Sequence, residues 1–107
     1  MSTEQIDKLL TMIKELNGSD LHVSAGMPPK IRVHGHLRPV SKEPLTAAQT
    51  DALLLPMLDE KRQKLLAEKN DLDWAYAMPG VARFRCSFFR QQHGLAGVFR
   101  MIPEEIL

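Results

Sequence analysis

Alternating apolar and polar residues between positions 81 and 100 predict two neighbouring β-strands that organise the chain. Phe84, Cys86 and Phe88 fall on one parity and polar residues mostly on the other, which is the period of a strand with one buried face. Another apolar segment follows residues 91–94, so a β-hairpin with a short glycine-containing loop is expected. The aromatic side of the first strand should therefore belong to the hydrophobic core.

The register of this hairpin decides whether three arginines form a cluster. If residues 91–94 are the loop, Arg85 lies opposite Arg100, and Arg83 shares their face two residues along. Two like charges about 5 Å apart repel by roughly 1 to 3 kcal/mol, so an anion would be a suitable partner. A loop one residue longer or shorter would move Arg100 to the opposite face. The alternative is that the arginines only keep an outer sheet face solvated.

The N-terminal segment has the apolar spacing of an amphipathic helix over residues 3–16. Ser2 and Gln5 have the spacing of a capping box at its start, and Asn17 with Gly18 should end it. The inward positions of this helix are Ile6, Leu9, Leu10, Ile13 and Leu16.

The remaining pattern predicts alternating strands and two further helices. Thr46 with Gln49 forms another capping box, Asp59 can cap the following helix, and Asn70 should stop it. Trp74 lies on the apolar parity of a later strand. The expected strands cover residues 19–23, 30–33, 36–40, 71–76 and the hairpin, and the helices cover 47–55 and 60–69. This order predicts an α+β fold with a mainly antiparallel sheet of about six strands and about three helices.

Composition narrows the function classes. The chain has 107 residues, enough for about one domain, and a formal net charge of +1, which predicts neither broad nucleic-acid binding nor strong attraction to an anionic membrane. The one cysteine, Cys86, is expected to be a small core residue. The N-terminus lacks the features of a signal peptide, and no window has 18 continuous apolar residues. A cytoplasmic location is therefore favoured.

The sequence lacks the common catalytic motifs. No glycine is followed by lysine, so the phosphate-binding loop of P-loop enzymes is absent, and no catalytic residue is assigned to this chain. His22, His34 and His36 do not have the usual zinc-ligand spacing, so no metal site is expected. The acidic residues Asp71 and Asp73 could form structural ion pairs with Arg83 or Arg85.

Four segments together resemble a known family. They read GSDLHVSAGMPP at residues 18–29, IRVHG at 31–35, PGVARFR at 79–85 and VFRMIP at 98–103. In this order and spacing they are similar to the N-terminal region of the PilT/PilU family of type IV pilus retraction ATPases. His34 departs from the acidic residue that usually precedes the turn glycine, which concerns the turn and not the arginines.

This resemblance implies a PAS-like N-terminal domain over residues 1–102. Residues 103–107 would then begin a linker to an absent RecA-like ATPase domain, which carries the Walker motifs in this family. Arginines of the N-terminal domain approach the nucleotide phosphates there, and the matching positions are Arg83, Arg85 and Arg100. The terminal Ile106 and Leu107 without a capping signal look like the start of such a segment.

The resemblance also implies partners and cofactors. ATP and Mg²⁺ would bind the full-length protein, with none expected on this fragment. The partners would be the chain's own ATPase domain, neighbouring subunits of a homohexamer and the pilus machinery at the inner membrane, with no nucleic acid; the location would be cytoplasmic and peripheral to that membrane. The alternative is a PAS-type ligand-sensing or interaction module acting alone, which should enclose an apolar cavity.

Overall fold

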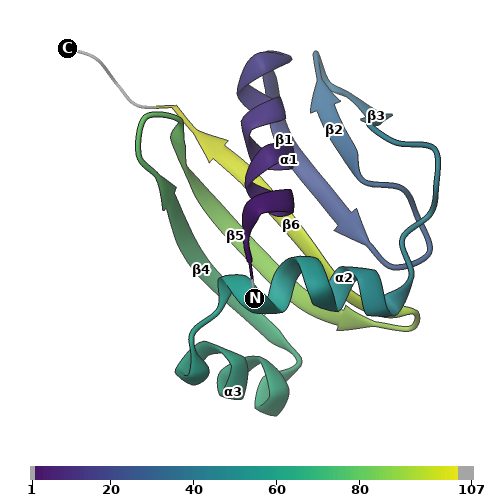
Figure 1. Ribbon diagram of the computed structural model, residues 1–107, viewed down its shortest axis with the longest axis vertical. Helices are drawn as coiled ribbons and strands as arrows, with labels where there is room; N and C mark the ends of the chain where they lie inside the picture. Colours follow the sequence, from purple (N-terminus) through teal and green to yellow (C-terminus); the bar gives the residue numbers. More distant parts are fainter. Residues whose placement is uncertain (1, 104–107) are drawn as a thin grey trace.

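The computed structural model describes residues 2–103 as one sheet with helices packed against it (Figure 1). The strands are β1 (Gly18–Ser24), β2 (Lys30–Val33), β3 (His36–Pro39), β4 (Asp71–Met78), β5 (Ala82–Gln91) and β6 (Gly94–Ile102). The helices are α1 (Glu4–Glu15), α2 (Ala47–Leu54), a single 3₁₀ turn η1 (Leu55–Met57) and α3 (Glu60–Lys69). The predicted α+β class, with six strands and three α-helices, is confirmed.

The six strands form a single sheet in the order β3-β2-β1-β6-β5-β4, and every neighbouring pair is antiparallel. Two meanders, β1-β2-β3 and β4-β5-β6, are joined where β1 pairs with β6. Helices α1 and α2 pack on one face, α1 over β1 and α2 over β6, and α3 packs against β4 (Figure 1). The opposite face of the sheet carries no helix of the described chain.

Local capping residues explain where two of the helices begin and end. Thr46 Oγ1 accepts a hydrogen bond from the Gln49 amide at 3.1 Å, and Gln49 Oε1 accepts one from the Thr46 amide at 2.8 Å. Asp59 Oδ1 accepts from the Arg62 amide at 2.8 Å, and Asn70 ends α3 in the left-handed conformation with φ 62°. These predicted caps are confirmed: the side chains of Thr46, Gln49 and Asp59 accept from backbone amides, and the Asn70 amide donates to the Leu66 carbonyl at 2.8 Å.

The predicted capping box at the N-terminus is wrong. The residue before α1 is Thr3, and its hydroxyl makes no capping hydrogen bond but donates to Asp7 Oδ2 at 2.9 Å. Ser2 Oγ accepts from the Glu4 amide at 3.0 Å, two residues on. The helix therefore begins one residue later than the Ser2–Gln5 spacing requires.

The core lies between the helices and the aromatic face of β5 and β6. Phe84, Cys86, Phe88 and Ile13 are buried there as predicted, and Phe99 of β6 joins them. The rings of Phe88 and Phe99 pack edge to face with centroids 5.6 Å apart. Side chains thus fill the space between sheet and helices.

Three predicted core positions need correction. Leu9 and Trp74 are partly buried residues at the margin of the core, and Leu16 is 44% exposed. Leu9 lies beside the buried stripe of α1. Trp74 is on the edge strand β4, where only one side of the strand has a neighbour, and the Arg62 guanidinium covers its ring at 5.7 Å. Leu16 follows the last helical residue and faces outward.

The hairpin of β5 and β6 has the register expected from the sequence. Arg90 lies opposite Leu95, and Arg85 lies opposite Arg100. The loop is shorter than predicted, since only residues 92 and 93 separate the strands, but it shortens equally on both sides and the register is unchanged. Gly94 has φ 139°, and a Cβ there would lie 2.9 Å from the Ala47 side chain, so α2 approaches the hairpin only because this residue is glycine.

Candidate functional site

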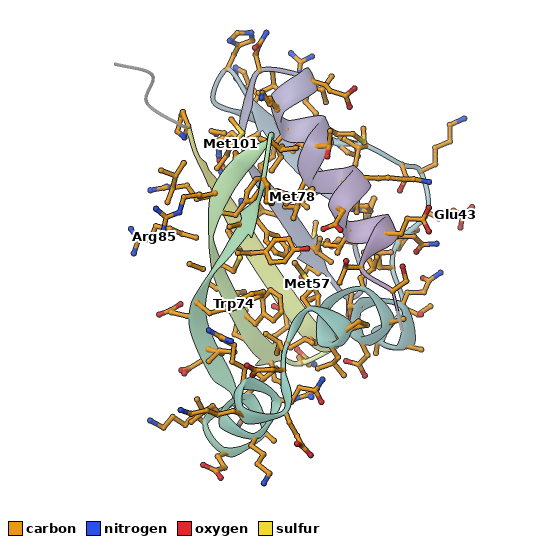
Figure 2. The ribbon with its side chains drawn as sticks, turned by 60° about the vertical axis from the view of Figure 1, so that its left-hand side comes forward. Glu43, Met57, Trp74, Met78, Arg85 and Met101 are labelled. Carbon is orange, nitrogen blue, oxygen red and sulfur yellow. The ribbon has the colours of Figure 1, made fainter. Side chains whose placement is uncertain are left out.

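The sheet face that carries no helix holds a row of four charged residues. Across adjacent strands, Arg85 of β5 lies opposite Arg100 of β6, Arg100 opposite Asp20 of β1, and Asp20 opposite Arg32 of β2. Strand alternation places these side chains on the face opposite the aromatic core. Figure 2 shows Arg85 pointing away from α1 on this side of the sheet. This set is called the charged row below.

Arg83, Arg85 and Arg100 share this face, and all three are exposed. Within residues 2–103 none of their guanidinium groups has an ion pair or a hydrogen bond to another side chain or to the backbone. Arg85 and Arg100 line the same shallow hollow of about 560 Å³, together with Asp73, Ser87 and Val98. Arg83 lies outside it, opposite Ile102. The register thus brings two of the three predicted arginines into one hollow and leaves the third beside it.

The ion pairs predicted for Asp71 and Asp73 are not formed in the described part of the chain. Asp73 lies opposite Ser87 and Asp71 opposite Phe89, so neither acidic residue faces an arginine directly. The residues of β4 opposite Arg85 and Arg83 are Ala75 and Ala77. The prediction is wrong because the register of β4 on β5 places small side chains beside the arginines.

Asp20 is the one charged residue buried within residues 2–103, with 7% of its surface exposed. Its Oδ1 accepts a hydrogen bond from Ser19 Oγ at 2.5 Å, and its Oδ2 lies 2.8 Å from His22 Nε2 and 3.3 Å from Arg32 Nε. Burial raises the pKa of Asp20, but the hydrogen bonds to Ser19, His22 and Arg32 outweigh it and hold the pKa below the usual value of an aspartate. Asp20 is therefore an ionised carboxylate whose two oxygens are both engaged.

The buried carboxylate was not predicted from the sequence. Ser19, Asp20 and His22 lie on a strand that alternates, and that pattern predicts a solvated polar face. The one available signal is local: Ser19 precedes Asp20 and His22 follows it two residues on, so two of its three partners are close in sequence. Arg32 could not be connected to it, because the pairing of β1 with β2 is a tertiary contact.

The cysteine and the turn histidines, which could in principle react or bind metal, do not form a further site in residues 2–103. Cys86 is buried in the core, and burial raises the pKa of its thiol to about 12, so it stays protonated. His34 and His36 are exposed at the two-residue turn between β2 and β3, with His34 at φ 51°. Among residues 2–103 no three His, Cys, Asp or Glu side chains gather in a way that could hold a metal ion.

None of the described helices combines the length and apolar character needed to cross a lipid bilayer.

Comparison with known sequences identifies close relatives. No protein-family model matches the chain. The type IV pilus retraction ATPase PilT of Pseudomonas aeruginosa is 41% identical over 102 residues, which cover 95% of this chain and 30% of that protein. The type IV pilus ATPase PilU of the same organism is 36% identical over 102 residues, covering 95% of this chain and 27% of PilU. The chain thus spans less than a third of the length of these relatives.

Solved structures with the same fold include a pilus retraction motor and the ATPase DotB. The pilus retraction motor PilT, crystallised with bound ADP, matches 92% of this chain and 30% of its own with a TM-score of 0.80 and 35% identity. The Legionella pneumophila ATPase DotB covers 96% of this chain and 30% of its own with a TM-score of 0.81. At 22% identity the DotB match concerns the fold alone.

Proposed function

The chain belongs to the PilT/PilU family as the N-terminal domain of a secretion ATPase, and we propose that it serves a hexameric retraction motor by presenting Arg83, Arg85 and Arg100 to ATP. On this proposal the nucleotide and its Mg²⁺ are held mainly by a C-terminal ATPase domain that lies outside this chain. The N-terminal domain packs between subunits of the ring and acts at the cytoplasmic side of the pilus machinery.

The observation that carries the proposal is the opposed pair Arg85 and Arg100. They lie directly across two strands on an open face, in one hollow, with no acidic partner within residues 2–103. Like charges at this separation repel, so the pairing by itself contributes nothing to the fold. A triphosphate supplies the missing negative charge, and guanidinium groups bind phosphate oxygens through two parallel hydrogen bonds. The ADP in the solved PilT relative supports a nucleotide as the ligand.

The arginines would contribute to ATP hydrolysis by stabilising negative charge on the phosphates, and they would form or break no covalent bond themselves. On this proposal Mg²⁺ is held by the ATPase domain, and the one thiol of this chain, Cys86, is buried in the core. Guanidinium groups aimed at the γ-phosphate stabilise the charge that develops on its oxygens when the bond to the β-phosphate breaks. Their loss should therefore lower turnover more than nucleotide affinity.

A PAS-type sensing module is the rival function. Such a module needs an enclosed apolar cavity with a few converging polar groups. Here the space between helices and sheet is occupied by packed aromatic rings, with Trp74 and Phe88 centroids 5.4 Å apart and Phe88 and Phe99 centroids 5.6 Å apart. A filled core and an open face with arginines favour the motor domain.

The test is the steady-state ATPase rate of an intact enzyme that contains this domain. Arg85→Ala and Arg100→Ala should each lower kcat about ten- to a hundredfold with a smaller change in nucleotide affinity, and Arg83→Ala should have a smaller effect because it lies outside the hollow. Arg90→Ala is the matched control, because Arg90 is an exposed arginine of the same strand that does not line the hollow. Turnover at the wild-type rate in all three variants would refute the proposal.

A further inference from the structure

Asp20 and Arg100 lie directly opposite each other, yet they do not form an ion pair. Residues opposite one another on antiparallel strands have Cβ atoms about 4.5 to 5.5 Å apart, and an arginine side chain is long enough to close that distance. Attraction to Asp20 and repulsion from Arg85 on the other side both favour such a pair. Another interaction of the Asp20 carboxylate must therefore prevent it from forming an ion pair with Arg100.

Both carboxylate oxygens of Asp20 already have hydrogen-bond partners, and one of these partners is a cation. Ser19 donates a hydrogen bond to Oδ1, and His22 and Arg32 both contact Oδ2. Arg32 is the one permanently charged partner among them. Arg32 also donates from Nη1 to the Gly35 carbonyl at 3.1 Å, so the β2–β3 turn holds its guanidinium in place. A carboxylate that is neutralised by a fixed arginine attracts a second arginine much less.

We infer that Arg32 is a positioning residue for the phosphate-facing site. By pairing with Asp20, Arg32 prevents an ion pair between Asp20 and Arg100 and so keeps the Arg100 guanidinium available to an anion. This inference rests on the proposed function for its consequence, but its structural part can be tested alone. Without Arg32, Asp20 would be a buried carboxylate with no cationic partner. Arg100 is the other arginine directly opposite Asp20, so it can replace Arg32 in the ion pair. The competition would then draw Arg100 away from Arg85 and weaken the site.

The first measurement needs no ligand. In the ¹⁵N-labelled 107-residue chain, the side-chain Nε–Hε signal of Arg100 should exchange rapidly with water, as expected for an unpaired guanidinium. Arg32→Gln should shift this signal and slow its exchange severalfold, because Arg100 now binds Asp20. Asp20→Asn in the Arg32→Gln background should restore the wild-type behaviour. An Arg100 signal that is the same in Arg32→Gln and wild type would overturn the inference.

The second measurement titrates inorganic triphosphate at low ionic strength and follows Arg85 and Arg100. Arg32→Gln should weaken binding about two- to fivefold, the factor that corresponds to losing one exposed ion pair, and the added Asp20→Asn should recover it. Arg32→Lys keeps a cation beside Asp20 and should behave like wild type. A purely structural role for Arg32 would make the double variant worse than the single one and would contradict the inference.

Two controls separate this mechanism from its alternatives. Lys30→Gln removes one positive charge from the same strand without touching Asp20, so an effect as large as that of Arg32→Gln would mean a general charge effect and would overturn the inference. Arg32→Met supplies a second removal of the charge if the glutamine variant folds poorly. Wild-type turnover of Arg85→Ala and Arg100→Ala in the intact enzyme would refute the proposed function, while the ligand-free measurement would still decide the role of Arg32.

Discussion

Two arginines that flank the same carboxylate should differ sharply in their contribution to stability. Arg32 and Arg100 both lie opposite Asp20, one on β2 and the other on β6. Arg32 Nε is 3.3 Å from Asp20 Oδ2, whereas Arg100 has no acidic partner within residues 2–103. Replacing each by alanine therefore removes a similar side chain from the same row but only one ion pair.

The structure allows the size of this difference to be worked out. The Asp20 side chain is 10% exposed and that of Arg32 is 36% exposed, so their bond lies between a surface ion pair and a buried one. Charge-assisted hydrogen bonds contribute about 1.5 to 3 kcal/mol and exposed ion pairs about 0.2 to 1 kcal/mol. We expect Arg32→Ala to lower the free energy of unfolding by about 1 to 2 kcal/mol. Arg100→Ala should stay within about 0.5 kcal/mol of wild type or be slightly stabilising, because it relieves repulsion from Arg85.

Urea unfolding of the 107-residue chain at pH 7 measures both values. With a slope of about 1 to 3 kcal/mol per molar urea, Arg32→Ala should lower the midpoint by roughly 0.3 to 2 M at unchanged slope. A loss above about 2 kcal/mol for Arg100→Ala would show that Arg100 is a structural ion-pair partner. No loss for the double variant Arg32→Ala/Arg100→Ala, in which neither arginine can pair with Asp20, would show that the Asp20 network contributes little.

Three further outcomes are expected. Phe84→Ala should destabilise the chain by about 3 to 5 kcal/mol in urea melts, because Phe84 is 0% exposed, while the control Phe89→Ala on the outer face of the same strand should cost much less. The lowered pKa of Asp20 means that its contribution to stability is present above about pH 4 and is lost as the pH falls further. Asp20→Asn should therefore make the decrease in unfolding free energy between about pH 5 and pH 2 less steep than in wild type. An equally steep decrease in the variant would contradict the role assigned to Asp20. The 107-residue chain should be a monomer or weak dimer with millimolar or no ATP binding, since three charge-assisted contacts hardly exceed the cost of association; a stable hexamer in light scattering or micromolar ATP affinity in calorimetry would argue against this.

The local features of this fold follow from short stretches of sequence. The caps at Thr46, Asp59 and Asn70, the two-residue turn at His34 and the buried parity of Phe84 depend on residues a few positions apart. The register of the β5–β6 hairpin belongs to the same class, because a short loop constrains the pairing of the strands on either side of it. The position of Arg85 opposite Arg100 could therefore be predicted from the sequence alone.

The features that make the charged row a possible site depend on distant strands. Asp20 is paired with Arg32, 12 residues away along the chain, only because β1 lies between β6 and β2, and the same strand order places Arg100 opposite it from 80 residues away. The predicted pairing of Asp73 failed for a local reason, since the register of the β4–β5 hairpin places Ala75 and Ala77 opposite Arg85 and Arg83. A strand's own pattern indicates which side chains share a face, but their neighbours on that face are chosen by strand order and register, and these are set by the packing of the whole core.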